Sequence, residues 1–332
     1  GLFAIPEDRS SLSVLDPGAG SGILSIALLE RLESVKTIDR VEFVCYENDP
    51  NIIELLRSNM DWACRQSTKS VSYKIVTDNY IISQMADYNC SLGANPDADK
   101  FDMVIGNPPY MKIGKDATEA LAMPDVCYGA PNLYFLFATM SMFNLKENGE
   151  MVYIVPRSWT SGAYFKQFRK RLFEDGVLEH IHLFVSRNKV FDKESVLQET
   201  IIVKVRKITE EPEMVTITSS KSNSDFGEIT SLMVPYDLVV SGANHYVYLV
   251  TDKDEVEVLK KLHKFKKTLP AIGVKMKTGL TVDFRNREIL RDEKEEGAIP
   301  LFYSQHIRYG KVIFPIKKEH EYVVPEKKGL MQ

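Results

Sequence analysis

A short apolar segment followed by a glycine-rich turn constrains the fold of this chain more than any other feature. Residues 11–16 (SLSVLD) have the pattern of a buried strand, and residues 17–22 (PGAGSG) supply a turn. In residues 23–32 the apolar positions then recur at helical spacing. The same order of strand and helix returns in residues 41–47 and 51–64. Such alternation predicts an α/β protein with a parallel sheet.

The complete pattern predicts a seven-stranded, mostly parallel, Rossmann-like sheet. Further strands are expected at residues 71–77, 101–106, 150–155, 178–185 and 198–205. Helices are expected between them at residues 133–144 and 164–173. Residues 186–196 show little helical pattern, so the last two strands are expected to pair antiparallel at one edge of the sheet.

The pattern changes after Lys207, which predicts a boundary between domains. A chain of 332 residues exceeds the usual size of one domain, so a smaller second domain is expected. We expect a first domain at residues 1–207, a connecting segment at 208–244 and a second domain that begins at 245 and is truncated at 332. The boundary segment contains a charged Glu-Glu-Pro sequence and a serine-rich stretch.

Composition limits the location and the partners of the protein. No apolar run approaches the ~20 residues of a membrane span, which predicts a soluble protein without a membrane partner. The four cysteines form no CxxC pair, and the histidines lack the spacing of a metal site, so we expect a reducing, cytoplasmic compartment and no metal. The net charge of −4 divides unevenly: residues 1–150 carry 12 basic and 21 acidic side chains, and residues 151–332 carry 30 and 25. A polyanion would therefore meet the C-terminal half.

The glycine-rich turn predicts a nucleotide-like ligand. Gly18, Gly20 and Gly22 allow close approach of backbone to a ligand at the start of a helix. The dinucleotide fingerprint fails because Ile23 stands where its third glycine would lie, which disfavours nicotinamide and flavin cofactors. Asp16 at the end of the first strand suits a positively charged ligand, and S-adenosyl-L-methionine has that character.

Two further acids follow the next strands. Glu47 ends the second strand at the spacing where nucleotide sites place an acid for the ribose hydroxyls. Asp78 follows the third strand, where its carboxylate could accept from the adenine amino group of the cofactor; a turn formed by Asp78 and Asn79 is the alternative. The carboxyl ends of parallel strands meet at one edge, so these acids are expected to share one site.

The sequence Asn107-Pro108-Pro109-Tyr110 after the strand at 101–106 predicts the catalytic group. An exocyclic amino nitrogen is a poor nucleophile because its lone pair is conjugated into the ring. The side-chain oxygen of Asn107 and the carbonyl of Pro108 can each accept one amino hydrogen, and the prolines hold these acceptors in place. Tyr110 offers a face on which a base can stack.

With these motifs the chain resembles the amino-directed, N6-adenine DNA methyltransferases of bacterial restriction–modification systems. The motif order, with the cofactor loop before NPPY and a recognition domain after it, is that of the gamma type. The resemblance implies that S-adenosyl-L-methionine is bound by Asp16 to Gly22, Glu47, Asp78 and Asn107, and that residues 107–110 grip the target base. Asn107 favours adenine, since cytosine-directed relatives more often carry Ser at that place.

The resemblance also implies base flipping from double-stranded DNA. Tyr110 would stack on one face of the flipped adenine and Phe191 on the other. An ordinary core position is an equally good interpretation of Phe191. Lys275–Leu280 and Phe302–Tyr309 resemble the start of a target-recognition domain. A restriction endonuclease, fused or separate, is a partner that the resemblance allows. The family's additional cofactor segment, which precedes the glycine loop, is expected upstream of Gly1.

Two other functions remain open at this point. The NPPY chemistry also serves methyltransferases that act on a glutamine amide of translation release factors, but those chains typically end near the seventh strand. A non-catalytic DNA-binding specificity subunit with the same fold is the second alternative, and the intact residues 107–110 argue against it.

Overall fold

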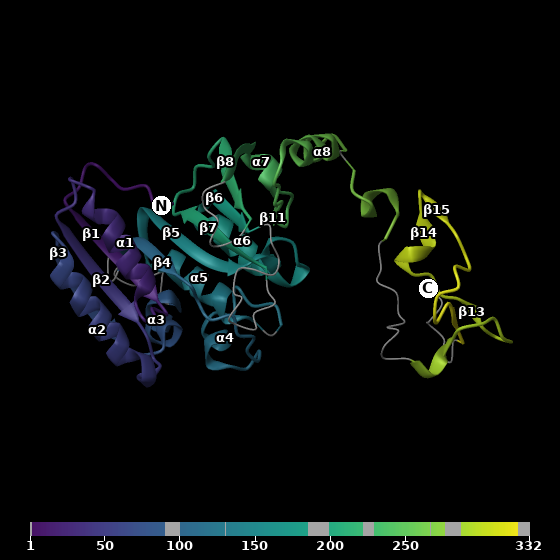
Figure 1. The fold of residues 1–332 in the computed structure, drawn as a ribbon, viewed down its shortest axis with the longest axis horizontal. Helices are drawn as coiled ribbons and strands as arrows, with labels where there is room; N and C mark the ends of the chain where they lie inside the picture. The colour runs from purple at the N-terminus through teal and green to yellow at the C-terminus, as the bar shows by residue number, and fades with distance from the viewer. Residues whose placement is uncertain are drawn as a thin grey trace. The chain divides into compact units, whose positions relative to one another are not determined.

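In the computed structural model, the chain divides into two compact units, Gly1–Lys264 and Phe265–Gln332. The structure describes residues 2–89, 100–129, 131–184, 199–221, 229–265, 267–275 and 287–324. The first unit runs past the predicted domain end at 207 and through the predicted connecting segment, because that segment supplies two strands of the main sheet (Figure 1).

The main sheet of the first unit has nine strands among the described residues, in the order β3-β2-β1-β4-β5-β7-β6-β8-β9. They are β1 (Ser11–Pro17), β2 (Arg40–Tyr46), β3 (Ser70–Val76), β4 (Phe101–Gly106), β5 (Leu145–Pro156), β6 (Val177–Phe184), β7 (Thr200–Arg206), β8 (Met214–Ser220) and β9 (Thr230–Pro235). The first five strands in sequence pair parallel, β7 is antiparallel to both of its neighbours, and β9 is antiparallel to β8. The predicted α/β class with a mostly parallel sheet is confirmed.

The prediction of seven strands was wrong, because β8 and β9 extend the sheet beyond β6. The sequence of β8 alternates buried Val215 and Ile217 with partly buried neighbours, as a strand does. Its serines and threonines had suggested a linker, although threonine favours strands. The antiparallel pairing of β6 and β7 is confirmed, but these strands lie inside the sheet and not at its edge.

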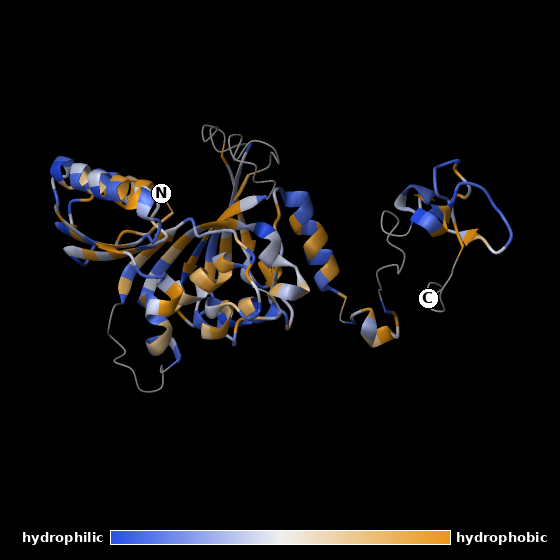
Figure 2. Ribbon diagram, turned by 90° about the horizontal axis from the view of Figure 1, so that it is seen from below, coloured by the Kyte–Doolittle hydropathy of each residue, from blue (hydrophilic) through white to orange (hydrophobic). Residues whose placement is uncertain are grey.

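Helices on the two faces of the sheet enclose separate apolar cores. The helices are α1 (Ile23–Glu33), α2 (Pro50–Gln66), α3 (Tyr80–Asn89), α4 (Thr118–Ala122), α5 (Leu133–Asn144), α6 (Lys166–Asp175), α7 (Tyr236–Val239) and α8 (Lys253–His263). In one core, β1 and β2 pack against α1 and α2 through residues such as Leu12, Leu28 and Leu56. In the other core, strands β4, β5, β6 and β7 pack against α3, α5 and α6. Figure 2 shows the apolar residues in orange along the central strands and on neighbouring helices. Of the residues with a described placement, no helix is long and apolar enough to cross a membrane.

The second unit has a small core of its own. Ile289, Leu290 and Val323 are buried in it, and Ile299 and Leu301 pack against them. Its strands are short: β12 (Leu290–Arg291), β13 (Ile299–Pro300), β14 (Ile307–Arg308), β15 (Lys311–Val312) and β16 (Tyr322–Val323). Strand β16 pairs antiparallel with β12 and β13, and β14 pairs antiparallel with β15. Among the predicted recognition segments, residues 276–280 lie outside the described residues.

Candidate active site

The carboxyl ends of β1 to β4 surround a cavity of about 240 Å³. It is lined by Gly18, Tyr46, Glu47, Asn48, Asp78, Tyr80, Asn107, Pro109 and Phe137. Five of these were predicted from the sequence as site residues: Gly18, Glu47, Asp78, Asn107 and Pro109. The topology explains this, because parallel strands deliver their following loops to the same edge. The sequence therefore identified residues that the fold brings together.

The glycine turn between β1 and α1 is fixed to the end of β2. The backbone amides of Gly18 and Ala19 both donate to the carbonyl of Tyr46, at 2.8 Å. Gly18, Gly20 and Gly22 all have positive φ, at 92°, 55° and 81°. Such backbone favours glycine, since side chains of L residues are strained there. The turn is thus built around three residues with positive φ and is held to β2 by two backbone hydrogen bonds.

Glu47 links this turn to the start of α2. Its Oε2 accepts the amide of Gly20 and its Oε1 accepts the amide of Asp49, both at 2.9 Å. Asp49 in turn caps α2 by accepting the amide of Asn51 at 2.9 Å. Each carboxylate oxygen has a further lone pair. Glu47 can therefore hold the loops and still accept hydrogen bonds from hydroxyl groups in the cavity.

Asp16 lies buried below the turn and not in the cavity lining. Burial raises the pKa of its carboxyl group to about 7, against the hydrogen bond from Ser25, and the charge of Glu47 raises it further. The hydroxyl of Ser25 donates to Oδ2 at 2.7 Å, whereas Oδ1 is buried with no hydrogen-bond partner in the described part of the chain. An unsatisfied buried acceptor is costly. Asp16 thus provides latent negative charge beside the acids of the cavity.

Asp78 and Asn79 have different roles in the structure, although the sequence left open whether they form a turn or bind a ligand. Oδ1 of Asn79 accepts the amides of Ile81 and Ile82, at 3.1 and 3.2 Å, and so starts helix α3. Asp78, one residue earlier, lines the cavity. The helix cap therefore belongs to Asn79, and the carboxylate of Asp78 remains available to a ligand.

An aromatic wall that the sequence analysis missed borders the cavity. Tyr46 and Tyr80 meet edge to face with ring centroids 5.0 Å apart, and Phe137 lies 5.3 Å from Tyr80. Tyr80 was missed because the helix α3 that it begins was not predicted. The ring of Phe137, on α5, is only partly buried and reaches the cavity. Aromatic faces of this kind can pack against an adenine ring.

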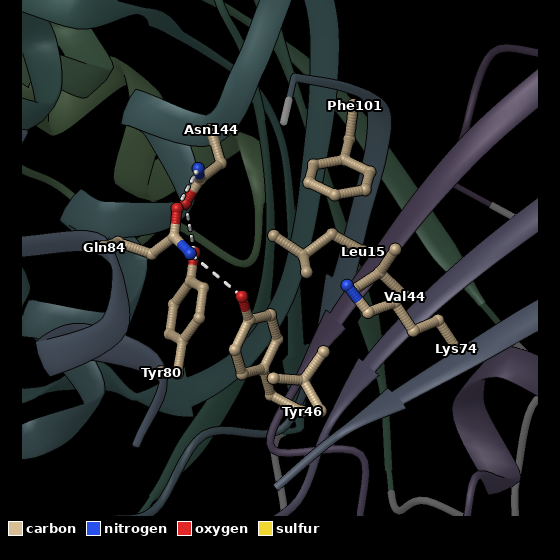
Figure 3. Close-up of a pocket in the computed structure, with 9 residues that line it drawn as sticks. Leu15, Val44, Tyr46, Lys74, Tyr80, Gln84, Phe101 and Asn144 are labelled. Atoms are coloured by element: carbon tan, nitrogen blue, oxygen red, sulfur yellow. Dashed lines mark hydrogen bonds between the residues drawn. The ribbon is translucent and has the colours of Figure 1, made fainter. Parts of the chain in front are cut away.

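A buried polar network supports this wall from behind (Figure 3). The hydroxyl of Tyr80 donates to Oδ1 of Asn144 at 2.8 Å, and Nδ2 of Asn144 donates to Oε1 of Gln84 at 3.1 Å. Nε2 of Gln84 then donates to the hydroxyl of Tyr46 at 2.9 Å. Buried polar groups that are fully paired specify one arrangement of their side chains. The network therefore fixes both tyrosines of the cavity wall.

Residues 107–110 follow β4 directly. Asn107 and Pro109 are exposed, Pro108 is buried, and Tyr110 is partly buried. The hydroxyl of Tyr110 donates to Oδ1 of Asn107 at 2.6 Å and also lies 2.9 Å from the carbonyl of Ile154. Its ring meets Tyr134 edge to face, with centroids 6.3 Å apart, and burial raises the pKa of the Tyr110 hydroxyl. This hydroxyl is therefore protonated at neutral pH and is a donor to Asn107.

Other predicted residues lie beside the cavity or outside the described ranges. Gly20 and Gly22 belong to the turn, and Pro108 and Tyr110 to the loop after β4, without lining the cavity. Phe191, the predicted second stacking residue, lies outside the described residues. Within those residues there is no group of three or more His, Cys, Asp or Glu side chains that could hold a metal ion.

Comparisons with known proteins find methyltransferases of restriction–modification systems among the relatives of this chain. Residues 31–191 match the family model of the Eco57I restriction-modification methylase. The chain is 33% identical over 315 residues to the type II methyltransferase M.PstI of Providencia stuartii, covering 92% of this chain and 60% of that protein. It is 32% identical over 330 residues to the type II methyltransferase M.BsuBI of Bacillus subtilis, covering 97% of this chain and 64% of that protein. The chain thus spans about three-fifths of the length of these relatives.

A solved structure shows the same fold. It is a protein of Listeria monocytogenes with the provisional description of a class I S-adenosylmethionine-dependent methyltransferase. The TM-score is 0.50 at 20% identity, and the match covers 66% of this chain and 61% of that one. The family match and the two type II methyltransferases, and not this structure, confirm the expected resemblance to methyltransferases of restriction–modification systems.

Proposed function

From the match of residues 31–191 to the Eco57I restriction-modification methylase family, we infer that the chain methylates the exocyclic amino group of adenine in DNA. The observation that carries this proposal is the position of Asn107. Its amide stands at the carboxyl end of β4 and lines the same cavity as Glu47 and Asp78. A methyl donor and an amino group could therefore meet at this point.

The cavity suits S-adenosyl-L-methionine, which supplies the methyl group when it is bound. Glu47 would accept from the ribose hydroxyls and Asp78 from the adenine amino group. The rings of Tyr46, Tyr80 and Phe137 would enclose the adenine. One oxygen of the buried Asp16 carboxyl has no hydrogen-bond partner among the described residues, and burial raises its pKa to about 7. A ligand with positive sulfonium and ammonium groups would favour the ionised form of this carboxyl. The residues present thus fit this cofactor.

Asn107 and Pro108 would prepare the target nitrogen. Two acceptors for the two amino hydrogens draw the nitrogen lone pair out of conjugation with the ring, and Pro108 and Pro109 fix the backbone that carries them. The proton can leave after the nitrogen has become cationic, so no separate general base is required. To use Asn107 in this way, the amino group must share Oδ1 with the hydroxyl of Tyr110 or displace it.

DNA is the substrate that the second unit favours. The stretch of residues 257–318, which begins in α8 of the first unit and continues through most of the second, contains 15 basic and 7 acidic side chains, whereas the chain as a whole carries −4. A basic segment that follows the catalytic unit suits phosphate contacts. We therefore propose that the adenine flips out of the duplex into the site, that Tyr110 and Phe191 stack on it, and that the enzyme works in a restriction–modification system with a fused or separate endonuclease.

The test is transfer of a tritiated methyl group from S-adenosyl-L-methionine to duplex DNA by the complete protein, followed by nucleoside analysis. We expect N6-methyladenine, and Asn107→Ala should abolish the label. Asn51→Ala, an exposed asparagine on α2, is the matched control and should keep it. Label that appears in a release factor and not in DNA would contradict the proposal and favour glutamine methylation.

A further inference from the structure

The β14–β15 hairpin carries an unusually exposed tip. Ile307 pairs with Val312 and Arg308 with Lys311, so that Tyr309 and Gly310 alone make the turn. Both turn residues have positive φ, 51° and 73°. Two consecutive residues with positive φ are typical of a type I′ turn, whose twist matches that of a two-stranded antiparallel ribbon. The hairpin is therefore a defined element and not an irregular loop.

The base of the hairpin is anchored in the second unit by His306. This side chain is fully buried; its Nδ1 accepts the amide of Tyr303 at 2.9 Å, and its Nε2 donates to Oε1 of Glu321 at 2.7 Å. The same oxygen accepts the amide of Ile316 at 2.7 Å. Phe314 packs against the imidazole ring, with centroids 5.2 Å apart. These contacts hold the residue that immediately precedes β14.

The tip, in contrast, is exposed along both sides. Tyr309 is 101% exposed, and Ile307 and Val312 are each 62% exposed. A tyrosine with its whole ring in water at the end of an anchored hairpin contributes nothing to a core. Exposed apolar groups that cluster on one element mark an interaction site. The rigid base and the exposed tip together suit an element that reaches toward a partner.

The charge around the hairpin defines the chemistry of that partner. Residues 302–318 contain Arg308, Lys311, Lys317 and Lys318 and no Asp or Glu. The ammonium of Lys318 lies 4.0 Å from the centre of the Tyr303 ring, at the base of the hairpin. A purely basic segment in a chain of net charge −4 is complementary to a polyanion. A two-stranded ribbon also fits the width of a DNA major groove.

We propose that the hairpin Ile307–Val312 is a DNA-contacting element of the second unit. Arg308 and Lys311, directly opposite each other, contact phosphates, and the ring of Tyr309 packs against bases in the groove. This inference rests on the proposed function, because that function makes duplex DNA the substrate. It adds the residues through which the second unit meets it.

The first experiment measures binding of the complete protein to a random-sequence DNA duplex over a range of salt concentrations. Each lost phosphate contact reduces the slope of log affinity against log salt by about 1. We expect Arg308→Ala/Lys311→Ala to reduce the slope by about 2. Lys36→Ala/Arg57→Ala, which removes one lysine and one arginine from exposed positions of the first unit, is the matched control and should leave the slope unchanged.

The second experiment places a reporter at the tip. Tyr309→Trp keeps an aromatic ring, and DNA should shield the new indole from acrylamide quenching. The wild-type protein, to which this chain contributes Trp62 and Trp159, gives the background. Because Tyr309 has no buried surface, the substitution should leave the unfolding transition unchanged.

The outcomes separate this inference from the proposed function. Suppose that the wild-type protein methylates DNA, that the double variant keeps the wild-type salt slope and that DNA does not protect the indole at position 309 from the quencher. In that case the hairpin proposal is overturned and the proposed function stands. If both hairpin effects appear without methylation of DNA, the hairpin proposal stands and the enzymatic one fails. A wild-type protein that does not bind the duplex contradicts both.

Discussion

The hydroxyl of Tyr110 donates a 2.6 Å hydrogen bond to the side-chain oxygen of Asn107, the atom proposed to accept an amino hydrogen of the target base. The carbonyl of Ile154, 2.9 Å from the same hydroxyl, is a competing acceptor for its single proton. Tyr110 therefore combines two features: a ring that packs beside the cavity and a hydroxyl that donates to the side chain of Asn107, for which we propose a catalytic role. These features can be separated by substitution.

Tyr110→Phe should retain most of the methyl transfer, and Tyr110→Ala should lose much more. The phenylalanine keeps a stacking face and releases Oδ1 of Asn107 for the substrate, whereas alanine removes the face as well. Loss of one stacked aromatic ring is worth ~1–3 kcal/mol, or a decrease of roughly 5- to 150-fold in kcat/KM. Steady-state kinetics on duplex DNA measures the difference. Equal losses in the two variants would show that the hydroxyl, and not the ring, is required.

Asp16 should make stability depend on pH. Its pKa is about 7 in the folded protein because of burial, and about 3.9 in an unfolded chain. Between these values the folded state binds more protons, so the free energy of unfolding falls as pH rises from about 4 to about 7, by roughly 4 kcal/mol. Asp16→Asn should remove this slope, and the exposed Asp8→Asn should not. Urea unfolding at several pH values gives the answer; parallel pH profiles for the wild type and Asp16→Asn would contradict the prediction.

Gly22→Ala should destabilise the protein more than Gly20→Ala does. Both positions have positive φ, which costs an alanine roughly 1–2 kcal/mol. A Cβ on Gly22 would also lie 2.8 Å from Cδ1 of Leu56 on α2, whereas a Cβ on Gly20 meets nothing within 4 Å. Urea midpoints of the two variants provide the comparison. A lower midpoint for Gly20→Ala would reverse the order and refute the steric argument.

Asn144→Leu should weaken both stability and cofactor binding. The substitution removes the nearer partner of the Tyr80 hydroxyl, which keeps a 3.4 Å contact with the Ser141 hydroxyl, and it removes the donor to Oε1 of Gln84 in a buried network. Each buried polar group left without its partner costs about 1–3 kcal/mol. Since Tyr46 and Tyr80 line the cavity, we also expect a higher dissociation constant for S-adenosyl-L-methionine, measured by calorimetry at a temperature where the variant is folded. Asn51→Leu, on the exposed side of α2, is the control.

The positions of Glu47, Asp78 and Asn107 could be predicted because each follows an apolar strand of a parallel sheet. Hydrophobic period and strand order suffice for this, since all such strands end at one edge. The strands β8 and β9 could not be predicted in the same way. Their alternation includes serine and threonine, and only pairing with β6 and with each other buries Val215, Ile217 and Val234.

The sequence by itself predicted the segment 107–110 that we propose for catalysis, and it determined the glycine turn and the α/β class, because these depend on local backbone constraints and on strand periodicity. Tertiary structure decided which side chains complete the site. Tyr46, Tyr80 and Phe137 come from β2, α3 and α5 and meet only when the sheet and its helices pack. The same holds for Asp16: its carboxyl group is ordinary in the sequence, and only burial below the turn raises its pKa to about 7. Desolvation and contacts between distant segments are properties of the folded chain, and no local pattern encodes them.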